Sequence, residues 1–106
     1  GTYITSSRLL YIECVPPFSF NYSKQEKIKK LQLGIGQLTN ALQINEHDAT
    51  LHHDLGLLLS HELIGKYQEA IYHWNLASRL DPNNSIYYAQ IGYIYQYFLY
   101  NFNKEI

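Results

Sequence analysis

The feature that most constrains this sequence is an internal repeat with a period of 36 residues. Four pairs of segments share this offset: Leu55-Gly56 with Ile91-Gly92, Ala41 with Ala77, Asn45–Asp48 with Asp81–Asn84, and Tyr67–Ala70 with Asn103–Ile106. Self-similarity at a fixed period of about 20–50 residues is typical of units that stack and bury a continuous core together. The period therefore favours a section of a stacked array over an independent globule.

Apolar residues within each repeat follow helical spacing. Ser23-Lys-Gln-Glu26 matches a capping box and predicts a helix that ends near Ile44. Further helices are predicted over residues 49–62, 67–80 and 85–100, separated by turns rich in Gly, Pro, Asn and Asp. The residues from Lys104 onward are expected to begin a fifth helix. The sequence thus predicts an all-α fold.

The first 22 residues lack a clean period. Pro16-Pro17 indicates an extended stretch, and Arg8–Val15 is compatible with either a short helix or a strand. We therefore divide the chain into an extended or irregular arm (1–22) and a helical repeat domain (23–106). That domain comprises a half repeat over 23–48, a full repeat over 49–84 and a partial repeat over 85–106.

The full repeat carries a recognisable order of small and large residues. In sequence these are Leu55-Gly56, Leu59, Gly65, Tyr67, Ala70, Trp74, Ala77 and Pro82. This order resembles the signature of the tetratricopeptide repeat (TPR) family over roughly residues 25–106. The resemblance implies antiparallel helix-turn-helix repeats stacked as a right-handed solenoid. It also implies that Gly56, Ala70 and Ala77 are small residues at the contact between paired helices.

Some features depart from that family. The common repeat has 34 residues, and the excess here falls in the turn over 60–66. Glu46 replaces the usual Pro of the first turn. Related Sel1-like repeats are often this long, but the turn Asp81–Asn84 favours the TPR interpretation.

The resemblance also implies a concave surface lined by the first helix of each pair. Helical geometry places six candidate partner-binding residues on that surface: His53, Leu57, His61, Tyr93, Gln96 and Tyr97. The helix over 85–100 is apolar almost all round. Two interpretations stay open: its tyrosines pack on further repeats or on the N-terminal arm, or they bind a partner.

The predicted concave surface lacks the charged residues that bind acidic peptides, which indicates the kind of ligand it would accept. Relatives that grip the charged tails of chaperones use a clamp of Lys, Asn and Arg, where this sequence has His53, Leu57 and Gln90. An apolar or aromatic protein ligand is therefore expected rather than an acidic peptide.

Other chemistries find little support. The net charge of −1 argues against nucleic-acid binding. A single cysteine, Cys14, excludes an internal disulfide or a cysteine-based zinc site. The five histidines are poorly spaced for a shared metal, and no catalytic or phosphate-binding motif is present. No apolar run is long enough to cross a membrane. We expect no enzyme activity, cofactor, metal or membrane span.

The function expected is that of a protein-interaction scaffold, a subunit or assembly factor within a multi-subunit complex. A second hypothesis is an interaction module of a larger enzyme polypeptide, and a third is a stand-alone hydrolase or metal enzyme. Tyr, Ile and Asn are each more frequent than Ala, Arg or Gly, and lysines outnumber arginines, a bias that resembles that of chains encoded by AT-rich genomes. We expect an intracellular location, and this bias leaves an organellar one, such as a plastid, open.

Overall fold

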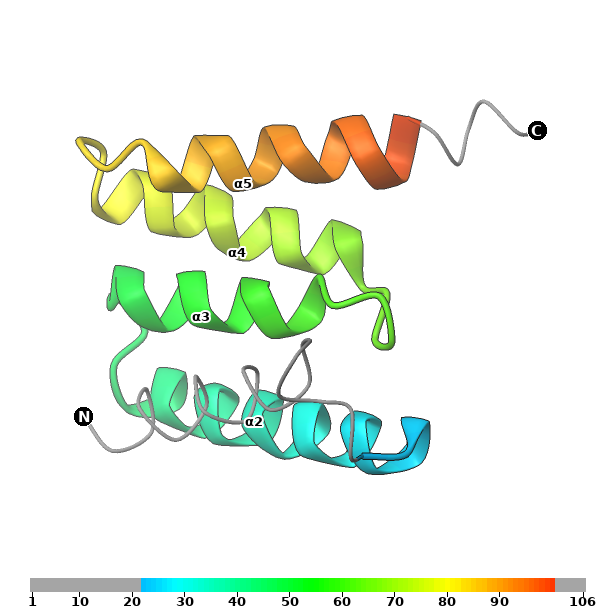
Figure 1. Ribbon diagram of the computed structural model, residues 1–106. Coiled ribbons are helices and arrows are strands. Elements are labelled where there is room, and N and C mark those ends of the chain that lie inside the picture. The colour runs from blue at the N-terminus through cyan, green and yellow to red at the C-terminus, as the bar shows by residue number, and fades with distance from the viewer. Residues whose placement is uncertain (1–21, 101–106) are drawn as a thin grey trace.

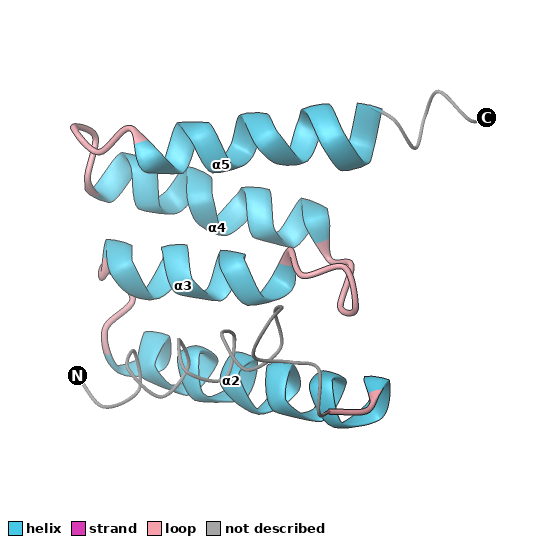
Figure 2. Ribbon diagram, viewed as in Figure 1, coloured by secondary structure: helices cyan, strands magenta, loops and turns pink. Residues whose placement is uncertain are grey.

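The described part of the chain is entirely helical. The computed structural model describes residues 22–100, which form four α-helices and no strand. They are α2 (Lys24–Ile44), α3 (Ala49–Leu59), α4 (Tyr67–Leu80) and α5 (Ile86–Ile94), and α5 continues into a π-helical segment, η1 (Tyr95–Tyr100) (Figure 2). The predicted all-α class is confirmed. The N-terminal arm up to residue 21, with Cys14, and the expected fifth helix lie outside the described residues.

The helices stack in chain order. Each contacts the next one along the chain, and neighbours run antiparallel, so that α2 and α5 lie at opposite ends of the row (Figure 1). Short turns join them. Consecutive antiparallel helices with short connections are the arrangement that a repeating helical period favours.

The helix starts have local causes that the sequence contains. The Ser23 hydroxyl accepts a hydrogen bond from the Glu26 N–H at 3.1 Å, as the capping pattern predicts. At the start of α3 the Asp48 carboxylate accepts from the N–H groups of Thr50 and Leu51 at 2.9 and 3.2 Å. These oxygens satisfy donors that have no partner inside the helix.

The helix α3 ends earlier than the sequence predicts. It stops at Leu59 rather than Glu62, because the His61 carbonyl accepts hydrogen bonds from the N–H groups of Ile64 and Gly65 at 2.9 and 2.8 Å. Gly65 has a φ of 69°, a left-handed conformation that side chains disfavour. These bonds turn the chain back toward α4.

The core runs through the middle of the row. Its buried apolar side chains come from α2, α3, α4 and α5: Leu31, Leu38, Ala41, Leu51, Leu55, Leu58, Leu59, Ala70, Ile71, Trp74 and Ile94. Trp74 of α4 lies against Gly56 of α3, where an added Cβ would come within 2.8 Å of three ring atoms. Gly56, Ala70 and Ala77 are buried, and Gly56 lies at the contact between these two helices.

The last helix differs from its prediction. A single α-helix is expected over 85–100, but α-helical geometry ends at Ile94 and the turns of η1 are π-helical. The Tyr95 N–H contacts two carbonyl oxygens, those of Ile91 and Gly92, at this transition. A π-helical turn is wider than an α-helical one, so the side chains after Ile94 shift around the helix axis.

Candidate functional site

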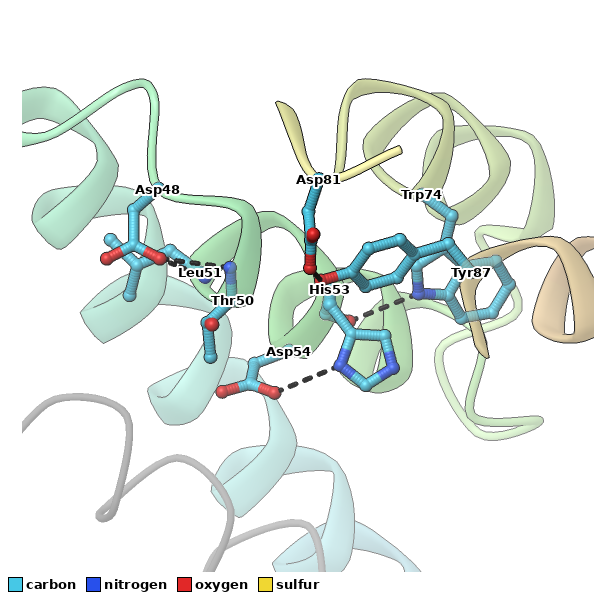
Figure 3. A network of polar contacts seen from close by, with 8 residues as sticks. All are labelled: Asp48, Thr50, Leu51, His53, Asp54, Trp74, Asp81 and Tyr87. Carbon is cyan, nitrogen blue, oxygen red and sulfur yellow. Dashed lines mark hydrogen bonds and ion pairs between the residues drawn. The ribbon is translucent and has the colours of Figure 1, made fainter. Parts of the chain in front are cut away.

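The predicted partner surface begins on α3 with His53, which is largely covered. Its side chain is 13% exposed and its Nδ1 lies 3.4 Å from the Asp54 Oδ1. Its ring lies against the ring of Tyr87 from α5, with centroids 5.4 Å apart (Figure 3). His53 therefore fills space between α3 and α5 instead of standing free on the surface.

Two hydrogen bonds near His53 fix the helices on either side of it. The Trp74 indole N–H donates to the His53 carbonyl oxygen at 3.1 Å, which ties α4 to α3. The Tyr87 hydroxyl donates to the Asp81 carboxylate at 3.3 Å, which ties α5 to the turn after α4 (Figure 3). Burial, followed by the Asp81 charge, raises the pKa of Tyr87, so this hydroxyl keeps its proton at neutral pH.

The two other predicted residues near the end of α3 are half-buried. Leu57 packs against the hydrophobic core. His61 organises the turn, since its Nδ1 accepts a hydrogen bond from the Leu63 N–H at 3.1 Å in addition to the bonds at its carbonyl. His61 thus has a local structural role that the sequence pattern did not reveal.

The three predicted residues on α5 and η1 are exposed. Tyr93 and Tyr97 are 50% and 52% exposed, and Gln96 is exposed as well. The rings of Tyr93 and Tyr97 lie side by side, with centroids 4.7 Å apart and a tilt of 35°. This tyrosine pair offers two adjacent aromatic faces to a ligand.

The structure has a concave region that the sequence did not predict. A groove of about 730 Å³ runs between the end of α2 and the outer side of α4. Its lining combines apolar and polar side chains: Thr39, Leu42, Gln43, Glu46, His47, His52, Leu55, Tyr72, His73, Leu76, Arg79 and Leu80. Because these residues come from three helices (α2, α3 and α4) and from the turn between α2 and α3, no single-helix pattern could have predicted the groove.

Two histidines meet at the floor of this groove. The His52 Nε2 lies 2.8 Å from the Glu46 carbonyl oxygen, which can only accept, so Nε2 carries the proton. The His52 Nδ1 then accepts from the His73 Nδ1 at 3.0 Å. Burial first, and the His52 ring second, lower the pKa of His73, while the Glu69 charge acts in the opposite direction. The structure therefore favours the uncharged form of His73.

Two features are absent from the described part of the chain. Within residues 22–100 there is no group of three or more His, Cys, Asp or Glu side chains that could hold a metal ion. In the same part of the chain no helix is both long and apolar enough to cross a membrane.

Comparison with known proteins adds no relative. No family model, no curated protein and no solved structure matches the chain significantly. What the chain does must therefore be inferred from its own residues and geometry.

Proposed function

We propose that this chain is a non-catalytic protein-interaction scaffold with a right-handed TPR-like solenoid architecture, acting as a subunit or assembly factor of a larger complex. The 36-residue period, the antiparallel stacking of neighbouring helices and the Trp74–Gly56 contact support the architecture. Repeat arrays of this kind act by presenting an extended surface to a partner.

The observation that carries the proposal is the surface of α5 and η1. Four tyrosines there are at least half exposed: Tyr88, Tyr93, Tyr95 and Tyr97. No charged residue occurs between Ser85 and Tyr97. A helix that is apolar on nearly every side is normally covered by something else. Tyrosine is among the residues enriched at protein interfaces, where its ring is buried and its hydroxyl finds a partner.

The chemistry of the partner follows from the same surface. Tyr93 and Tyr97 supply ring faces and hydroxyl groups but no charge, and Leu57 on α3 is apolar. An apolar or aromatic segment of a protein matches these groups better than an acidic peptide would. The proposal includes no enzymatic step.

A double substitution tests the function. The variant Tyr93→Ala/Tyr97→Ala removes both rings from an exposed face, and should leave helicity by circular dichroism unchanged. The wild-type chain is used to capture partners from an extract of the source organism, and the recovered proteins are quantified. We expect a stoichiometric partner whose recovery falls at least tenfold with the double variant, as about 1.4 kcal/mol of lost contact would produce.

The matched control is Tyr72→Ala. Tyr72 is 60% exposed on α4, within the groove on the outer side of that helix. Tyr72 matches Tyr93 and Tyr97 in residue type and in exposure but lies outside the surface of α5 and η1. The Tyr72→Ala variant should therefore leave partner recovery unchanged. Equal recovery with the double variant and the wild type would contradict the proposed surface.

A further inference from the structure

The His52–His73 pair opposes two nitrogen atoms along one line. Their Nδ1 atoms are 3.0 Å apart, the ring centroids are 5.3 Å apart, and the ring planes differ by 24°. For nitrogens this close, so large a centroid separation requires both Nδ1 atoms to lie near the line that joins the ring centres. The lone-pair directions of the two nitrogens therefore share one axis, with one nitrogen contributed by α3 and the other by α4.

One member of the pair is anchored, and the other has space to move. His52 is 7% exposed, and its Nε2–H donates to the Glu46 carbonyl oxygen at 2.8 Å, which leaves Nδ1 as the unprotonated nitrogen. A backbone carbonyl bound to the second ring nitrogen is an arrangement that orients metal-binding histidines. His73 is half-buried and lines the groove of about 730 Å³, so its ring can turn outward.

The charges near the pair favour a cation. Glu46 lines the groove, and the Glu69 carboxylate acts electrostatically on His73 from one helical turn away. Arg79 also lines the groove and opposes them. Two carboxylates thus face one permanently positive side chain.

The same geometry decides which class of ion fits. A structural zinc ion takes four ligands that converge on one point, whereas these two lone pairs are opposed. Among residues 22–100, no third His, Cys, Asp or Glu side chain joins them in a group that could hold a metal. Cu(I) accepts two ligands in a straight line, and imidazole suits copper. With metal–nitrogen bonds of about 2.0 Å, the two Nδ1 atoms would stand about 4 Å apart, so His73 has to withdraw by about 1 Å.

We infer that His52 and His73 bind one Cu(I) ion through their Nδ1 atoms in linear, two-coordinate geometry. The proton that the His73 Nδ1 donates to His52 in the metal-free pair moves through solvent to the His73 Nε2. Both rings therefore stay neutral, and no electron is transferred. The bound ion links α3 to α4, which is a property that the proposed scaffold function does not require.

Titration of the full chain with Cu(I) tests the site. Thiolates bind Cu(I) strongly, but Cys14 is the single cysteine and the chain has no methionine. The substitution Cys14→Ser therefore removes the one competing sulfur ligand, and every protein compared carries it. Affinity is measured without oxygen, by competition with a chromogenic Cu(I) chelator. We expect one bound equivalent, an X-ray absorption edge typical of two-coordinate Cu(I), and an affinity at least tenfold lower in His73→Gln.

The matched control is His47→Gln. His47 lines the same groove, but its side chain is 77% exposed and lies 3.4 Å from the Glu46 carboxylate. This variant should bind Cu(I) as tightly as its parent. A second readout needs no substitution in the pair: one equivalent of Cu(I) should shift the NMR resonances of the Nδ1 atoms of His52 and His73 in the Cys14→Ser protein.

Two results would overturn the inference. One is equal Cu(I) affinity of His73→Gln and its parent, together with unshifted Nδ1 resonances, which would leave the pair a hydrogen bond only. The other is binding of Zn²⁺ by the pair at least as tightly as Cu(I), because zinc requires converging ligands. Neither result bears on partner capture through Tyr93 and Tyr97, so the scaffold function stands or falls separately.

Discussion

At the scale of single residues, the least expected finding is the contact between His52 and His73. The sequence alone does not relate these two histidines, because they are 21 positions apart and belong to different helices. The structure gives each nitrogen of His52 a partner, the Glu46 carbonyl oxygen on one side and the His73 Nδ1 on the other. Such a pair accommodates one added proton, but a second would set two N–H groups against each other.

The pair predicts that stability falls in mild acid. The folded protein lowers the pKa of His73 below its ordinary value of 6.5, so the unfolded chain binds more protons there. The contribution of His73 is fully present above that value and is lost as the pH falls below it toward the lowered pKa. Urea unfolding between pH 5 and 8 should show this loss for the wild type and less of it for His73→Gln. Equal pH dependence in the two proteins would contradict the assignment.

At the scale of elements, the helices show what a sequence can predict and where it stops. The bounds of α4 agree with the prediction, because its apolar face and the Asp81-Pro82 stop are local features. The predicted end of α3 was wrong, because the observed end depends on the hydrogen bonds around His61. The exposure of Tyr93 and Tyr97 agrees with the face that helical geometry predicted for them. The contact of His53 with Tyr87 did not, because it depends on how α3 and α5 lie relative to each other.

The pairing of α3 with α4 predicts a strong effect of one methyl group. Gly56→Ala places a Cβ within 2.8 Å of the Trp74 ring, so the helices must separate or the ring must move. We expect the free energy of unfolding to fall by about 1–3 kcal/mol, as measured by urea denaturation. Gly36→Ala on α2 should leave it unchanged or raise it by up to about 1 kcal/mol. A Gly56→Ala protein as stable as the wild type would show that this contact is loose.

At the scale of the whole molecule, the helices of the row differ in how many packing contacts hold them. Interior helices contact neighbours on two sides, whereas α5 contacts α4 and touches α3 at His53. Among the residues described, α3 buries seven side chains or glycines, but α5 buries only Tyr87 and Ile94. Stability in such arrays is approximately a sum over neighbouring contacts, so the α5 end is the more weakly held one.

Hydrogen exchange tests this gradient. Amide protection should be highest in α3 and in the part of α4 around Trp74, and lowest in α5, because local opening requires fewer buried contacts to break there. Mass spectrometry of peptic fragments after exchange would resolve the helices. If α5 exchanged as slowly as α3 in the free chain, the unequal distribution of buried contacts would not determine local stability.

Because Trp74 lies at the contact with Gly56, its intrinsic fluorescence reports on the pairing of α3 and α4. Trp74 is the single tryptophan and is 1% exposed, between α3 and α4. Its fluorescence should be shifted to shorter wavelength while these helices remain paired, and should move to longer wavelength when they separate and water reaches the indole. Detachment of α5, in contrast, leaves the ring covered by α3. An unlabelled sample can therefore distinguish fraying of one end of the row from loss of its centre.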